Sequence, residues 1–137
     1  MRAKAWLASA ALSLAAPCVH ADVFLTEGTN LTVDVASDGR FVTDLLGGIW
    51  VVPANGGEAA AVAGGDSPAR RPRWSPDANS IAFEAHAPSG AEIWLYSVEA
   101  DKSRRLSEGR YVDQHPGWHP DAERIVFSSA RNDTDFD

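Results

Sequence analysis

Short apolar segments separated by polar turns run along the chain from residue 23 onward. Apolar and polar residues alternate in Leu31–Val35, the period of a half-buried β-strand. The other segments are short apolar runs bounded by Gly, Pro, Asn or Asp, as strands and their turns are. The pattern therefore predicts an all-β protein. The expected strands are residues 23–26, 31–35, 41–42, 49–52, 59–62, 72–75, 80–84, 92–98, 104–107 and 124–129, with one more around Trp118.

One strand–turn–strand unit occurs three times. Residues 73–83 (RWSPDANSIAF) are repeated as residues 117–127 (GWHPDAERIVF), and in weaker form as residues 35–42 (VASDGRFV). The aspartates of the three turns are separated by 39 and then 44 residues. They are Asp38, Asp77 and Asp121. This period is typical of a propeller blade of four strands.

The repeat predicts a partial β-propeller with about two and a half four-stranded antiparallel blades. Blade 1 spans about residues 31–66, blade 2 about 71–108 and the partial blade 3 about 115–137. Closed propellers have about four to eight blades, and a lone repeat cannot bury its apolar face. We therefore expect residues 22–137 to be an incomplete propeller, from a longer protein or a truncated reading frame, that is unstable or aggregation-prone alone.

Residues 1–21 have the pattern of a signal peptide. Arg2 and Lys4 precede an apolar run over residues 5–16, and Val19-His20-Ala21 offers a cleavage site before Asp22. The run is too short to span a bilayer, which needs about 20 apolar residues. A lipoprotein signal at Cys18 is the alternative, but Pro17 disfavours it. Cleavage near Ala21 predicts a periplasmic or secreted protein with no cysteine, and hence no disulfide.

The charge of the chain argues against nucleic acid as a partner. Its net charge is −7, and without Arg2 and Lys4 10 basic residues remain against 19 acidic ones. Such a chain repels phosphate backbones. Small basic clusters occur, but we expect them to be solvated strand ends or loops. They are Arg70, Arg71 and Arg73, and Arg104 and Arg105.

The two strong copies, WSPD followed by IAF and WHPD followed by IVF, resemble the repeats of TolB-like propellers. The resemblance covers nearly all of residues 22–137 and implies the propeller fold. Both copies depart from the family, because Ala78 and Ala122 stand where the family has a glycine after the aspartate. Asn79 is then the expected left-handed residue of its turn. The weak copy is one residue short before Leu45.

A second resemblance concerns residues 26–30 (TEGTN), 44–50 (DLLGGIW) and 53–59 (PANGGEA). These stretches are similar to the opening of secreted proteins that join an amino-terminal TolB-like propeller to a metal-dependent amidohydrolase barrel. The resemblance implies a divalent metal and a catalytic domain beyond Asp137. TolB itself begins with an α/β domain, whereas the first blade here begins shortly after the predicted cleavage site.

Histidines at metal-like spacing occur once, as His115 and His119, flanked by Asp113 and Asp121. Prolines at 116 and 120 argue against a helix. In an extended strand the two histidines lie about 13 Å apart at roughly 3.3 Å per residue, too far to share an ion. We therefore assign His115 and His119, and likewise His86, to turns and strand ends.

No catalytic, cofactor-binding or metal-binding residue is predicted in this chain. Residues 65–68 (GDSP) lack the trailing glycine of a nucleophile elbow, and no H-x-H pair occurs. The tryptophans that recur at equivalent places are expected to pack between sheets. They are Trp50, Trp74, Trp94 and Trp118.

Three functions fit these observations. The first is the propeller part of a metal-dependent amidohydrolase whose catalytic domain lies beyond this chain. The second is a non-enzymatic periplasmic propeller of the TolB kind that holds a peptide or protein on one face. The third is the propeller of a secreted serine peptidase of the prolyl oligopeptidase or tricorn type. In each case the remaining blades of the same protein are the first expected partner.

Overall fold

Ten strands form three antiparallel sheets in the computed structural model, which describes residues 31–88, 90–107 and 110–131. The first sheet contains β1 (Val33–Val35), β2 (Phe41–Leu45), β3 (Gly48–Val52) and β4 (Ala60–Ala63), in that order. The second contains β5 (Ala69–Trp74), β6 (Ser80–Ala87), β7 (Gly90–Ser97) and β8 (Lys102–Arg105). The third pairs β9 (Asp113–Trp118) with β10 (Ile125–Ser129).

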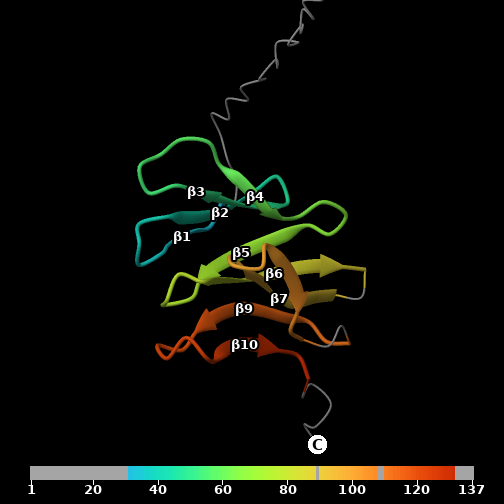
Figure 1. Cartoon of the computed structure of the whole chain (residues 1–137). Helices are drawn as coiled ribbons and strands as arrows, with labels where there is room; N and C mark the ends of the chain where they lie inside the picture. The colour runs from blue at the N-terminus through green and yellow to red at the C-terminus, as the bar shows by residue number, and fades with distance from the viewer. Residues whose placement is uncertain (1–30, 89, 108–109, 132–137) are drawn as a thin grey trace, which may run out of the picture.

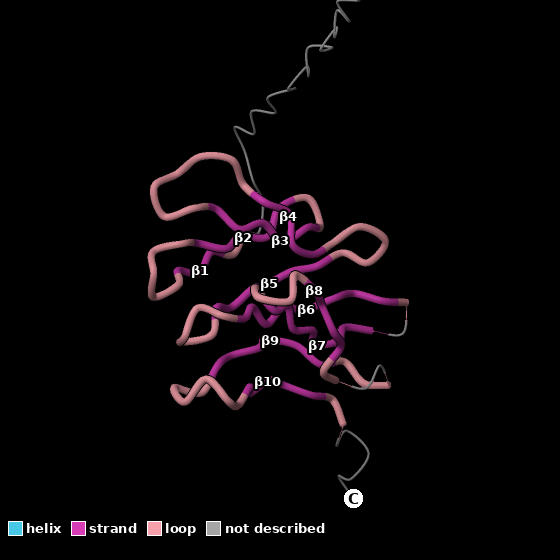
Figure 2. The backbone as a smooth tube through the Cα atoms, viewed as in Figure 1, coloured by secondary structure: helices cyan, strands magenta, loops and turns pink. Residues whose placement is uncertain are grey.

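The three sheets lie one upon another, so that each is a blade or the start of one (Figure 1). Within each sheet the chain meanders from strand to neighbouring strand, and loops connect the blades (Figure 2). The observed strands match the predicted ones to within a few residues. Strand β5 begins at Ala69, shortly before the predicted start of blade 2 at about residue 71. The predicted signal peptide, the predicted strand at 23–26 and the last part of the predicted blade 3 lie outside the described residues.

The turn between the first two strands of each blade has the same construction. The backbone N–H before the turn donates to the carbonyl after it, from Ala36 to Arg40, from Ser75 to Ser80 and from His119 to Arg124. The left-handed residue is the one after the aspartate in every copy. It is Gly39 at φ 87°, Ala78 at φ 59° and Ala122 at φ 61°.

The expectation that Asn79 is left-handed is wrong, because Ala78 adopts that conformation itself. Asp77 accepts hydrogen bonds from the Ser75 hydroxyl, at 2.5 Å, and from both the backbone and side-chain N–H groups of Asn79. These bonds lower the pKa of Asp77 below its ordinary value of 3.8, the Ser75 bond most of all. The ionised carboxylate thus holds the turn closed around an alanine.

The weak copy is shorter by one residue within its turn, and this fixes which side chains are equivalent. Trp50 of β3 lies opposite Thr43, and Trp94 of β7 lies opposite Phe83. The next pairs are Asp44 with Ile49 and Glu84 with Ile93. Asp44 and Glu84 therefore occupy the same place in blades 1 and 2, although they follow their turn aspartates at different distances.

The main apolar core lies between blades 1 and 2. Val42, Ile49 and Ile81 are each 0% exposed, and Trp74 packs among them. Trp94 packs against the edge of the same cluster, so the packing role predicted for these two tryptophans is confirmed. Burying large apolar side chains contributes about 1.5–3 kcal/mol each. The two blades are therefore held together chiefly by this interface.

We expect the Ala122→Gly variant to be more stable than the wild type by about 0.5–1 kcal/mol, because alanine is strained in the left-handed region and glycine is not. Ala122 is exposed enough that little packing is lost. The measurement is urea unfolding of the intact protein. The matched control is Ala60→Gly in β4, where φ is not positive and glycine should destabilise the strand. Equal shifts of the two variants would contradict the strain argument.

Candidate functional site

A buried carboxylate at the same place in blades 1 and 2 joins each blade to the next. Asp44 is 6% exposed and Glu84 is 0% exposed. The backbone N–H of Arg71 in β5 donates to Asp44 Oδ2 at 2.9 Å. In the same way the N–H of His115 in β9 donates to Glu84 Oε1 at 2.6 Å. Charge-assisted bonds of this kind are stronger than bonds between neutral groups.

The two donors lie in matching irregularities of β5 and β9, the first strands of blades 2 and 3. Arg71 and His115 have φ angles of 51° and 57°, and the ladder shifts register around each of them. Proline follows in both cases, at Pro72 and Pro116, and has no N–H for the ladder. The bulge therefore frees one N–H from the strand pairing and directs it to the carboxylate of the preceding blade.

Side chains extend these joints into a continuous line across the three blades. Arg71 Nη1 lies 3.1 and 3.0 Å from the two oxygens of Glu84, and His115 Nδ1 lies 3.1 Å from Ser128 Oγ. Thr32 Oγ1 donates to Asp44 Oδ2 at 2.7 Å. We call this line the interblade polar row. Its members are Thr32, Asp44, Arg71, Glu84, His115 and Ser128.

Arg70, Arg71 and Arg73 were expected to be solvated strand ends or loops, and the structure changes this interpretation for Arg71. Arg70 is exposed as predicted, but the side chain of Arg71 is 41% exposed and forms an ion pair with the fully buried Glu84. His86 Nε2 also lies 3.5 Å from Glu84 Oε2. With Arg71, His86 and the His115 N–H around it, Glu84 is already engaged. It binds blades 2 and 3 together.

A groove of about 440 Å³ crosses all three blades beside their first strands, β1, β5 and β9. Trp74 and Trp118 supply its aromatic surface, while Asp34 and Arg73 supply opposite charges. Two bonds across blades fix its shape, from the backbone N–H of Trp74 to Asp34 Oδ2 at 2.7 Å and from the indole Nε1–H of Trp118 to the Arg73 carbonyl at 2.9 Å. Aromatic surface with a few fixed polar groups is typical of sites that bind ligands.

His115 and His119 bind different partners. His119 Nδ1 lies 3.0 Å from Asp121 Oδ2, and Arg124 pairs with the same carboxylate at 2.7 Å. Burial alone would raise the pKa of Asp121, but hydrogen bonds from Glu123, Arg124 and His119 outweigh it and lower the pKa below 3.8. Asp121 is therefore ionised near neutral pH.

Asp113, the fourth residue of that sequence cluster, is 0% exposed and pairs with Arg131 at 3.2 Å. Within residues 31–88, 90–107 and 110–131, no three side chains of His, Cys, Asp or Glu converge as metal ligands would. The absence of catalytic, cofactor and metal residues from this chain remains a prediction. Among the same described residues, no helix is long and apolar enough to cross a membrane.

Repeated four-stranded antiparallel meanders, stacked face to face and joined by equivalent contacts, define a partial β-propeller. Its fold is that of the TolB-like propellers. TolB from Acinetobacter baumannii matches with a TM-score of 0.64 and 17% identity, over 74% of this chain and 27% of its own. A TolB-type protein from Agrobacterium tumefaciens matches with a TM-score of 0.63 and 22% identity, over 70% of this chain and 36% of its own.

The propeller domain of the Trilobed protease from Pyrococcus furiosus is a further match, with a TM-score of 0.57 and 19% identity. It is covered over 33% of its length by 71% of this chain. The chain thus spans about a third of the length of each of these three structures. No protein-family model and no curated protein matches the chain in sequence.

Proposed function

We propose that this chain is the propeller part of an exported hydrolase, in which the blades position or screen the substrate and residues outside 1–137 perform the chemistry. The observation that carries the proposal is the interblade polar row. Its buried carboxylates are engaged in joints between blades, as Glu84 is by Arg71 and His115, so the described residues act as a scaffold. The tryptophan-lined groove is the surface that such a scaffold offers to a substrate.

The proposed chemistry is that of a metal-dependent amidohydrolase. The support comes from residues 26–30, 44–50 and 53–59, which are similar to the opening of propeller–amidohydrolase proteins. In the structure, residues 44–50 form the hairpin of β2 and β3, and Gly56 N–H closes a turn on Pro53 O at 2.9 Å. A divalent metal, held by the proposed catalytic domain, would activate water against an amide-type bond.

The test is made on the full-length gene product. Its sequence should contain an H-x-H pair after a strand in a (β/α)-barrel pattern, and the purified protein should hydrolyse amide substrates. Chelation should abolish this activity, and Zn²⁺ or Mn²⁺ should restore it. A gene that stops after about six blades, or hydrolysis unaffected by chelators, would refute the proposal.

A non-enzymatic periplasmic propeller of the TolB kind is the second candidate. The TM-scores of 0.64 and 0.63 against TolB structures favour it, although they establish the fold alone. Such a protein would hold a peptide or protein partner in the groove. Stable capture of one envelope protein by the full-length product, lost in Trp118→Ala, together with no hydrolytic activity, would favour this function over the first.

A secreted serine peptidase is the third candidate, and the likeness to the Trilobed protease propeller favours it. Labelling of the full-length protein by a fluorophosphonate would distinguish it from both other functions.

All three functions are proposed for a periplasmic or secreted protein. Mass spectrometry of the mature amino terminus should then find Asp22, after cleavage at Ala21.

A further inference from the structure

Two opposite charges line the groove that crosses the three blades, and neither has a charged partner. Asp34 comes from β1 and Arg73 from β5. No ion pair within the described residues engages either side chain or joins the two to each other. Both residues are only half-buried, so a ligand can reach them. The groove therefore matches a ligand that carries a positive and a negative group at separate places.

Each charged group is held by one hydrogen bond and keeps bonding capacity for a ligand. Asp34 Oδ2 accepts the backbone N–H of Trp74 at 2.7 Å, and no donor among the described residues engages Oδ1. Arg73 Nη1 donates to the carbonyl of Pro72 at 3.0 Å, and a guanidinium has five N–H donors. The two charges are thus preorganised, which reduces the entropy cost of binding.

The same groove offers apolar surface that faces water. Val35 is 63% exposed, and Trp118 is half-buried. The indole of Trp118 is fixed, because its Nε1–H donates to the Arg73 carbonyl at 2.9 Å. Covering such surface with an apolar group stabilises a complex by about 25 cal/mol per Å². The groove therefore favours a ligand with an apolar side chain between or beside its charged ends.

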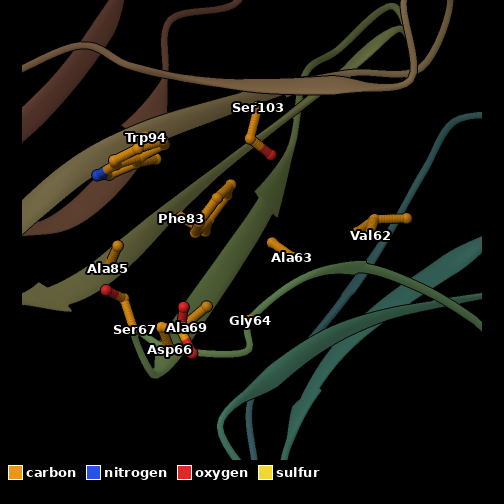
Figure 3. Close-up of a pocket in the computed structure, with 10 residues that line it drawn as sticks. All are labelled: Val62, Ala63, Gly64, Asp66, Ser67, Ala69, Phe83, Ala85, Trp94 and Ser103. Carbon is orange, nitrogen blue, oxygen red and sulfur yellow. The ribbon is translucent and has the colours of Figure 1, made fainter.

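The space between blades 1 and 2 beside Phe83 and Trp94 is of a different kind (Figure 3). Phe83 is 2% exposed and Ala69 is 1% exposed, and Trp94 packs against the same core cluster. This space belongs to the packing of the two blades. The groove at β1, β5 and β9 differs, because Ser37 and Pro76 on its border are exposed and leave it open to a ligand.

We propose that the groove binds a short peptide with free ends, about two residues long, that has an apolar side chain. The ammonium group pairs with Asp34, the carboxylate pairs with Arg73, and the side chain lies against Val35 and Trp118. The groove volume of about 440 Å³ is within the range of small-molecule sites. This inference rests on the proposed function, because it names the class of amide substrate that the propeller presents.

The test is isothermal titration of the full-length protein with Leu-Gly, its amino-acetylated form and its carboxy-terminal amide. EDTA is present, so that metal-dependent hydrolysis does not consume the peptides. We expect Leu-Gly to bind at least about fivefold more tightly than either capped form, from the usual strength of one exposed charge contact. Equal affinities of the three peptides, or no binding of Leu-Gly at millimolar concentration, would overturn the proposal.

Binding and hydrolysis fail separately in this design. Selective binding of Leu-Gly under EDTA, with no amide hydrolysis when metal is restored, would support the groove assignment and refute the amidohydrolase. Metal-dependent hydrolysis by a protein that does not distinguish free from capped peptides under EDTA would support the amidohydrolase and overturn the groove assignment.

Charge variants locate the two ends of the peptide. Asp34→Asn should lose the preference for the free over the acetylated amino group, because its amide oxygen still accepts the Trp74 N–H while the charge is gone. Arg73→Gln should lose the preference for the free carboxylate over the amide. Each variant should keep the preference that the other one loses. Loss of both preferences in either variant would overturn the assignment of the ends.

A pair of exposed valines tests the apolar contact. Val35→Ser should weaken Leu-Gly about three- to fivefold, since it removes apolar surface from the groove. Val33→Ser is the matched control, because Val33 lies on the same strand, is 58% exposed and does not line the groove. Urea unfolding shows that each variant is folded. Equal effects of the two substitutions on binding would overturn the placement of the side chain.

Discussion

The Glu84→Ala variant is expected to lose about 3–5 kcal/mol of unfolding free energy, because removing one partner of a buried ion pair leaves the others without compensation. Glu84 is 0% exposed and receives Arg71, the His115 N–H and the approach of His86. Its loss opens the joint between blades 2 and 3 as well as the ion pair within blade 2. The side chain of Arg71 is 41% exposed and can turn to water, which favours the lower end of this range.

Urea unfolding of the intact protein measures this effect. Glu84→Gln should fall between the wild type and the alanine variant, because its amide oxygen still accepts the His115 N–H while the charge opposite Arg71 is gone. Glu99→Ala, at an exposed position of the same blade, is the matched control and should change little. If Glu84→Ala and Glu99→Ala differed by less than about 1 kcal/mol, the carboxylate would not be the joint between the blades.

The Gly64→Ala variant is expected to lose about 2–4 kcal/mol, the sum of an overpacking cost and a strained backbone. A methyl group at this position would lie 2.8 Å from Gly48 Cα and 3.0 Å from Gly47 O, and both neighbours are backbone atoms that cannot turn aside. The φ angle of 126° is also one that alanine rarely adopts.

Gly65→Ala is its matched control, because the two glycines are adjacent and differ in what surrounds them. Gly65 has a φ of 94°, but a methyl group there meets nothing within 4 Å. Only the backbone strain remains, so the expected loss is about 1 kcal/mol. Thermal and urea unfolding compare the two variants. Losses of equal size would show that the contact of Gly64 with the β2–β3 hairpin is unimportant.

Local patterns were sufficient to predict the strands, because alternation and turn residues act over a few neighbouring positions. The strands predicted at residues 41–42 and 49–52 and the turns at Asp38, Asp77 and Asp121 lie where the pattern placed them. The left-handed alanines were not predicted. A local propensity assigns that conformation to Asn79, whereas the hydrogen bonds of Asp77 stabilise the turn with Ala78 in that place.

The candidate sites were predicted far less well. Arg71 and Glu84 were separate polar residues in the sequence, and nothing in their spacing indicates that both meet His115 of the next blade. Contacts between blades depend on how two sheets stack, and residues 31 positions apart, such as Glu84 and His115, carry no shared local pattern. The groove lined by Trp74 and Trp118 was missed for the same reason, because it belongs to three blades.

By itself the sequence determined the class of fold, the length of the repeat and the positions of its turns, since all three follow from short-range periodicity and backbone preference. Only the tertiary structure decided which polar residues are joints and which border open space. Stacking the blades buries Asp44 and Glu84 beside freed N–H groups, and it leaves Asp66 exposed on the loop after β4. A buried carboxylate must find donors, whereas an exposed one remains available to a ligand.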